Sequence, residues 1–145
     1  MTTIFNKYCE NSDHFTLAPF LKDIEHCFSA PTLDEVMKRL ESTNNEWSIK
    51  TLESLHKVCP GSLKVTFRAL HAGAVMDLKR CLMMEYRLTC HATENHDFPE
   101  GVRALLLDKD NNPKWNVRSL SEVTNNYVDS FFQKLSSGKE LTFII

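Results

Sequence analysis

Apolar residues recur at helical spacing along most of this 145-residue chain, and that periodicity constrains its fold more than any other feature. The clearest example starts at Thr32-Leu33-Asp34-Glu35. This segment is a capping box, in which Thr32 accepts a hydrogen bond from the backbone near Glu35 while the Glu35 side chain reaches back to the cap. An apolar face of two turns follows, made of Leu33, Val36, Met37 and Leu40. The pattern predicts an amphipathic helix.

The same signals predict helices along the rest of the chain. One helix is predicted to end at Ser29-Ala30-Pro31, and another is closed by Pro60-Gly61. The next helix begins at Ser62, a longer helix runs from Asp77 to about Glu94, and a short helix passes through Leu105 and Leu106. The capping logic recurs in Asp97-Phe98-Pro99-Glu100, with Asp97 as the cap and Glu100 in the third helical position. Ser119 and Thr124 are predicted to cap terminal turns. We therefore predict an all-α fold of about seven helices over residues 1–135, with a tail over 136–145.

The charge and apolar content of the chain exclude several classes of protein. Seventeen Lys and Arg residues against nineteen Asp and Glu residues give a net charge of -2, which provides no field to attract nucleic acid or an anionic membrane. No apolar run reaches the length needed to span a bilayer, and we see no signal peptide or transit peptide. The cysteines are odd in number and widely spaced, which fits free thiols in a reducing compartment: Cys9, Cys27, Cys59, Cys81 and Cys90.

Few residues are candidates for catalysis. The four glycines stand alone, so no Gly-rich loop can bring successive backbone N–H groups onto a phosphate or a developing oxyanion. Asp97 and Glu100 have carboxylates suited to acid–base chemistry, but their spacing is the one a helix cap requires, and we favour the cap. Cys59 or Cys90 as a nucleophile would need a base and an orienting group, and we favour buried, inert thiols.

Three other groups of polar residues admit two interpretations each. A metal cluster could be drawn from His91, His96, Cys81 and Cys90, but the spacings match no standard zinc pattern, and no metal or cofactor is predicted. Glu85 and Arg87 lie between apolar residues, so either could belong to a buried ion pair. The lysines Lys109 and Lys114 flank a proline-containing turn and could meet a phosphate, although solvated loop lysines are commoner.

Several ordered blocks of residues resemble one known family. Downstream these are Met84-Glu85-Tyr86-Arg87-Leu88, Asp97 to Ala104, Leu107-Asp108-Lys109-Asp110 and Pro113-Lys114-Trp115; upstream they are Cys27-Phe28-Ser29, Leu52 to Leu55, and Pro60 to Leu70. In this order they resemble the C-terminal portion of the 3-hydroxyisobutyryl-CoA hydrolases, a branch of the crotonase (enoyl-CoA hydratase/isomerase) superfamily. The resemblance extends from about residue 5 to residue 135, and the Pro-Lys-Trp ending favours the hydrolase branch.

The resemblance implies a function that this chain would not perform alone. It implies the hydrolysis of a short branched 3-hydroxyacyl-CoA thioester in valine breakdown, in mitochondria, with coenzyme A as part of the substrate and no other cofactor. In the family the spiral ββα core carries the catalytic groups, so no catalytic residue is carried over to this chain. Lys109 corresponds to a basic position near the CoA end of relatives and is carried over as a substrate contact. The partners implied are the missing core or full-length subunits.

Two consequences and two alternatives accompany this interpretation. We expect the isolated helices to leave uncovered the apolar surface that packs on the core in the family, and we expect the isolated chain to have no thioesterase activity. A non-catalytic paralogue that serves as a binding component, for example of the mitochondrial ribosome, is the first alternative. A stand-alone helical interaction module is the second. Upstream Gly-rich and acidic motifs, intact or eroded, would distinguish the enzyme from the paralogue.

Overall fold

The computed structural model describes residues 15–143 of the chain. Within that range it contains seven α-helices and no strand, which confirms the predicted all-α fold. The chain divides into two compact units, residues 1–49 and residues 50–145, and helix α4 (Glu46–Lys57) crosses the boundary. No helix among the described residues is both long enough and apolar enough to cross a membrane. Cys9 lies outside the described residues.

The first unit is built on α2 (Leu21–Phe28) and α3 (Leu33–Thr43), which pack against each other. As the capping box predicts, the Thr32 hydroxyl oxygen accepts a hydrogen bond from the Glu35 N–H at 3.2 Å. The reciprocal half of the box is not used, because the Glu35 carboxylate pairs with Arg39 at 3.4 Å. The four residues of the predicted apolar face are all buried, so the sequence pattern identified this core correctly.

Two further contacts hold the first unit together. The Arg39 guanidinium donates to the His26 carbonyl at 2.9 Å, which satisfies an acceptor left free at the end of α2. The Trp47 ring stacks on Phe20 with ring centres 6.0 Å apart and meets the edge of Phe28 at 6.4 Å. These aromatic pairs fix the start of α4 against the same unit.

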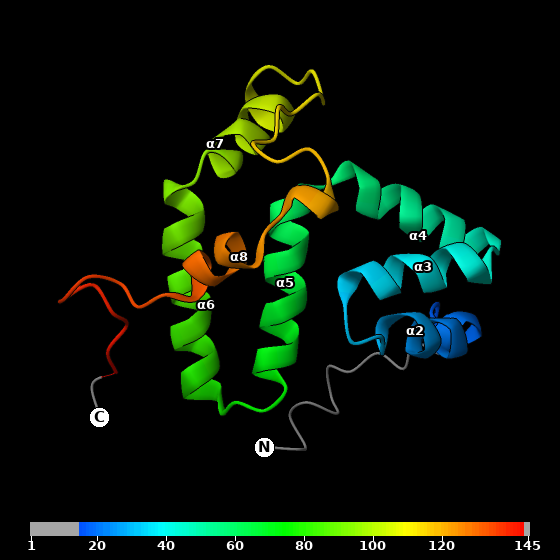
Figure 1. Ribbon diagram of the computed structural model, residues 1–145, viewed down its shortest axis with the longest axis horizontal. Coiled ribbons are helices and arrows are strands. Elements are labelled where there is room, and N and C mark those ends of the chain that lie inside the picture. Colours follow the sequence, from blue (N-terminus) through cyan, green and yellow to red (C-terminus); the bar gives the residue numbers. More distant parts are fainter. Residues whose placement is uncertain (1–14, 144–145) are drawn as a thin grey trace, which may run out of the picture. The chain divides into compact units, whose positions relative to one another are not determined.

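The second unit is a helical hairpin with one helix packed across it. Helices α5 (Pro60–Gly73) and α6 (Leu78–Glu94) run antiparallel, and α8 (Asn125–Phe132) contacts both (Figure 1). Asp77 caps α6 by accepting from the Arg80 N–H at 2.8 Å, and Thr124 caps α8 by accepting from the Tyr127 N–H at 3.2 Å. The predicted cap at Thr124 is confirmed, and so is the predicted start of the helix at Asp77. The buried core of this unit consists of Val65, Val123, Val128 and Phe131.

Three predicted boundaries are wrong. Pro60-Gly61 does not close a helix and Ser62 does not begin one, because α4 ends at Lys57 and Pro60 is the first residue of α5, with Cys59 at the cap position. Proline suits the first helical turn, since its fixed φ is helical and its missing N–H would have no partner there. Ser119 does not cap a helix with its side chain; its hydroxyl donates to the Glu122 carboxylate at 2.9 Å instead.

The segment after α6 is the short helix α7 (Asp97–Val102), which continues directly into a π-helical turn, η2 (Arg103–Leu107). The Asp108 N–H donates to the Arg103 carbonyl at 2.8 Å, the wider i to i+5 spacing that defines such a turn. A chain without regular structure leads from there to a short 3-10 helix, η3 (Leu120–Glu122), and then to α8. The predicted helix through Leu105 and Leu106 is confirmed.

Candidate functional site

Every residue weighed for chemistry lies in the second unit, and a cavity there has a volume of about 860 Å³. The cavity lies among the start of α5, the end of α6, α7 with η2, and the loop 111–115. Its walls are mainly apolar and include Val58, Phe98, Val102, Leu106 and Trp115. Polar groups gather among its lining residues, from Asn95, Asp97 and Tyr127.

Asp97 is the buried charge of this site, with only 6% of the residue exposed. One carboxylate oxygen, Oδ1, accepts from the Asn116 N–H at 2.7 Å, and the other, Oδ2, accepts from the Cys59 thiol at 3.3 Å. The prediction that Asp97 caps α7 is therefore wrong: it is the first residue of that helix, and its own N–H donates to the Asn95 side-chain oxygen at 3.1 Å. Its burial explains the difference, because a desolvated carboxylate is held by the donors that surround it.

Cys59 is buried beside this carboxylate and is held in its neutral form. Burial raises the pKa of the Cys59 thiol, and the hydrogen bond to Asp97 raises it further, while contacts with Ser62 oppose the shift. The thiolate is the nucleophilic species of cysteine, so a raised pKa leaves little of it at neutral pH. The predicted burial is confirmed for Cys59 and is wrong for Cys90, which is partly exposed.

Tyr127 belongs to the same polar cluster, and sequence reasoning missed it. Burial raises the pKa of the Tyr127 hydroxyl, with the charge of Asp97 adding to the shift. A Cβ placed on Gly61 would lie 2.7 Å from both Cε1 and the hydroxyl oxygen of Tyr127, so only glycine leaves room for this ring. The isolated Gly61 at a helix start was the available signal of a close approach.

Glu100 is occupied as well, though not as the capping box predicts. Its carboxylate makes a two-pronged pair with the Arg103 guanidinium, at 2.8 Å for both bonds, and accepts from the Lys114 N–H at 2.6 Å. Mainly because of Arg103, the pKa of Glu100 falls from 4.5 to about 2. A carboxylate with so low a pKa is a poor general base at neutral pH, so the structural role favoured from the sequence stands, with different partners.

Arg103 organises the turn after η2, a role that sequence reasoning also missed. Besides Glu100, its guanidinium donates to Asp108 at 2.5 Å and to Asp110 at 2.8 Å. These carboxylates raise the pKa of Arg103, so it stays charged. Within the turn, Lys109 and Asn111 have positive φ angles of 55° and 50°, a conformation that costs side-chain-bearing residues free energy. The ion pairs offset that cost.

Lys109, the carried-over substrate contact, is exposed at the tip of this turn. Its carbonyl accepts from the Asn111 side chain at 3.3 Å. It is not among the residues that line the cavity. Nothing about these contacts tests whether Lys109 meets coenzyme A, which stays a prediction.

The remaining candidates are dispersed along α6 and beyond. His91 Nε2 lies 3.1 Å from the Gln133 carbonyl, and His96 lies beside Asp97 at 3.2 Å. The described residues include no group of three or more His, Cys, Asp or Glu that could hold a metal. Arg87 forms a partly buried ion pair with Glu140 at 2.9 Å, which confirms one of the two ion-pair predictions. Glu85 has no ion-pair partner among residues 15–143.

Comparison with known proteins identifies the family of the chain. The family model described as enoyl-CoA hydratase/isomerase matches residues 1–132. The mitochondrial 3-hydroxyisobutyryl-CoA hydrolase of Xenopus laevis is 44% identical over 130 residues, 90% of this chain and 34% of that protein. The Dictyostelium discoideum protein of the same name is 45% identical, over 85% of this chain and 33% of that protein. The resemblance drawn from the sequence is confirmed, and the chain spans about a third of the length of these relatives.

Solved structures agree with this assignment. A carnitinyl-CoA dehydratase from Mycobacterium thermoresistibile superimposes with a TM-score of 0.84 and 26% identity, over 98% of this chain and 40% of that one. An enoyl-CoA hydratase from Rhodobacter sphaeroides gives a TM-score of 0.78 and 30% identity, over 98% and 43%. The helices described above thus occur together in larger proteins of the crotonase fold. On the match to nearly its whole length, this chain belongs to the enoyl-CoA hydratase/isomerase family.

Proposed function

We propose that this chain is the C-terminal helical part of a 3-hydroxyisobutyryl-CoA hydrolase, acting in valine breakdown in mitochondria, and that it is inactive until the rest of the enzyme joins it. The observation that carries the proposal is the continuous similarity to proteins of that name, 44% identical over 90% of this chain in Xenopus laevis. The share of the relatives that is covered, about a third, fits one part of such an enzyme.

The state of the candidate groups supports inactivity of the chain alone. Thioester hydrolysis needs a base that deprotonates water, but Asp97 is surrounded by donors and the pKa of Glu100 is about 2. It also needs donors for the negative charge on the carbonyl oxygen, and losing even one such donor typically costs about 100- to 1,000-fold in rate. The rest of the enzyme would supply these groups.

Exposed apolar side chains support the need for a partner. Leu105, Leu106 and Leu107 are 62%, 61% and 72% exposed, and the first two line the cavity together with Phe98. Contiguous apolar surface of this kind marks interaction sites. The exposure of these residues supports the expectation that the helices leave apolar surface uncovered. We propose that the crotonase core covers it.

The proposed contact of Lys109 with the CoA phosphates is compatible with its exposure at the tip of the turn. A lysine is a mobile point charge that suits phosphate. In the assembled enzyme, Lys109→Ala should raise KM for the acyl-CoA, with a dependence on ionic strength, and leave kcat nearly unchanged. Lys38→Ala, at an exposed position of α3, is the matched control. Equal KM values for the two variants would indicate that Lys109 is a solvated loop residue that does not contact CoA.

Reconstitution tests the proposed function. The 145-residue chain is mixed with the separately expressed remainder of the Xenopus laevis hydrolase, and release of free CoA from 3-hydroxyisobutyryl-CoA is followed. Turnover by the mixture that neither part gives alone supports the proposal. Binding without turnover, together with eroded catalytic motifs in the rest of the native polypeptide, would support the non-catalytic paralogue instead.

A further inference from the structure

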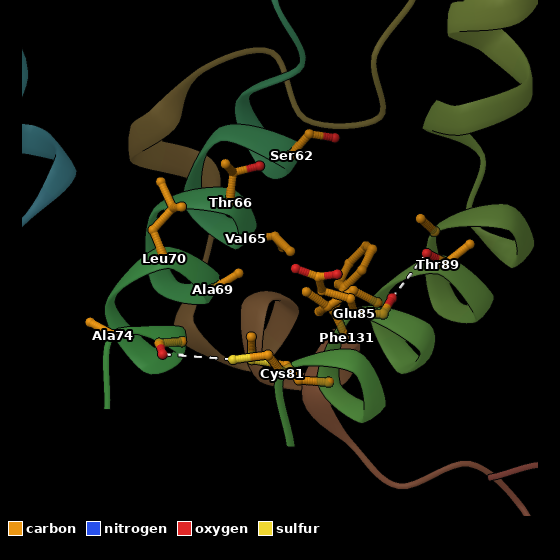
Figure 2. Close-up of a pocket in the computed structure, with 14 residues that line it drawn as sticks. Ser62, Val65, Thr66, Ala69, Leu70, Ala74, Cys81, Glu85, Thr89 and Phe131 are labelled. Carbon is orange, nitrogen blue, oxygen red and sulfur yellow. Dashed lines mark hydrogen bonds between the residues drawn. The ribbon is translucent and has the colours of Figure 1, made fainter. Parts of the chain in front are cut away.

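A second hollow in the same unit lies between α5 and α6, and its walls share Ser62, Ala92 and Phe131 with the candidate cavity. It has a volume of about 630 Å³. Figure 2 shows the two helices on either side, with the Phe131 side chain, from α8, between them. Val65, Met84 and Leu88 contribute further apolar surface, so this α5–α6 groove opens onto the core of the unit.

Some of the residues that line the α5–α6 groove are small. On α5 these are Ser62, Ala69 and Gly73, with Ala74 directly after the helix; on α6 they are Cys81 and Ala92. Small side chains let the backbone of another element approach closely, so the walls suit a helix laid along the groove. Leu70, among the lining residues, is 70% exposed and has no cover among the described residues.

One charged side chain faces this groove. Figure 2 shows the Glu85 carboxylate between the two helices, near Phe131. It forms no ion pair with any residue from 15 to 143, whereas Arg87, two residues on, pairs with Glu140. A helix that covered the groove would take the Glu85 carboxylate out of water, and a buried carboxylate requires a cationic or hydrogen-bonding partner. The occupant must bring that partner.

We propose that the α5–α6 groove is the docking site for one helix of the remaining part of the longer enzyme, a helix with an apolar face that carries a Lys or Arg to pair with Glu85. This rests on the proposed function, because about two thirds of the relatives' length lies outside the part that this chain matches. The apolar floor supplies affinity, and the carboxylate sets the register of the helix by requiring its cation at one position.

The rate of cysteine labelling measures directly whether the groove is covered. Cys81 lines it and Cys90, on the same helix, does not; both are free and partly exposed. The chain is treated with N-ethylmaleimide, alone and with the separately expressed remainder of the Xenopus laevis hydrolase, and labelling rates are measured peptide by peptide. We expect the partner to slow labelling of Cys81 by at least about tenfold and to leave Cys90 nearly unchanged.

Charge reversal tests the role of Glu85. Glu85→Lys should weaken binding of the remainder by about tenfold or more, because a like charge would face the incoming cation. Glu94→Lys, on an exposed position of α6 outside the groove, is the matched control and should bind as the unaltered chain does. Because Glu85 is exposed, its replacement leaves the folded chain intact, which the circular dichroism spectrum checks.

The outcomes separate this proposal from the proposed function. Protection of Cys81 without thioester turnover would support the groove and count against the hydrolase. Turnover with Cys81 labelled at its original rate, or equal binding of Glu85→Lys and Glu94→Lys, would overturn the groove and leave the hydrolase standing. Protection of Cys81 that grows with the concentration of this chain alone would overturn the proposed occupant in favour of a second copy. No protection and no binding would overturn it as well.

Discussion

Gly61→Ala is expected to destabilise the second unit even though alanine favours helices. Gly61 is the second residue of α5, and a Cβ there would lie 2.7 Å from the Tyr127 ring and its hydroxyl oxygen. The ring is not free to withdraw, because it packs on Phe131 with ring centres 5.2 Å apart and its hydroxyl is in the polar cluster around Asp97. The substitution therefore forces α5 and α8 apart.

Two opposing free energies decide the magnitude. Replacing glycine by alanine inside a helix typically stabilises by about 0.5–1 kcal/mol. Overpacking a well-filled site typically costs about 1–3 kcal/mol. The contact is far shorter than any that Cβ atoms tolerate, so we place the cost in the upper part of that range. The net result should be a loss of about 1–2 kcal/mol in the free energy of unfolding.

Urea unfolding followed by circular dichroism measures this loss, and a second background tests its cause. In Tyr127→Ala the obstacle is gone, so Gly61→Ala should become stabilising by about 0.5–1 kcal/mol, a reversal of sign. Gly73→Ala is the matched control, since a Cβ there would meet only Cys81 and Met84, at 3.7 and 3.9 Å. Destabilisation by Gly61→Ala of equal size with and without the Tyr127 ring would refute the reasoning.

Three further outcomes are expected. Since the pKa of Glu100 lies at about 2 in the fold and near 4.5 otherwise, the stability that it contributes is present above about pH 4.5 and is lost as the pH falls toward 2. Glu100→Gln should therefore weaken the dependence of the urea midpoint on pH between about 4.5 and 2. An unchanged dependence would contradict this prediction. Cys59, buried and with a raised pKa, should react with N-ethylmaleimide more slowly than the partly exposed Cys90, and equal rates at pH 7 would contradict the burial. Leu40→Ala, at a position with no exposure, should cost the first unit about 2–5 kcal/mol in urea unfolding, and a loss below 1 kcal/mol would show that Leu40 is not core.

Local signals in the sequence were enough to predict the helices. Thr32 and Thr124 each cap a helix as predicted, because a cap depends on residues three positions apart. The local pattern gave a wrong prediction at Asp97. The spacing of a capping box is present there, but the carboxylate accepts hydrogen bonds from Cys59 and Asn116, which are 38 and 19 residues away in the sequence. No local pattern reports such distant donors.

The sequence indicated which residues belong to the candidate site better than it indicated which groups those residues contact. Asp97, Glu100 and Cys59 were predicted to have structural roles, and each has a hydrogen-bond partner within the fold. Arg103 was missed because its role is to gather carboxylates that a chain reversal brings together, and periodicity does not report the path of a turn. Tyr127 was missed because its environment is formed by three separate helices.

The central claim, that this chain holds no complete catalytic apparatus, is tested most directly by assaying the purified 145-residue chain alone for release of free CoA from 3-hydroxyisobutyryl-CoA. We expect a rate no higher than the rate without protein, because the carboxylates and the thiol of the site are occupied by structural partners. Turnover by the chain alone, abolished by Asp97→Asn or Glu100→Gln, would contradict the account and place catalysis in this site.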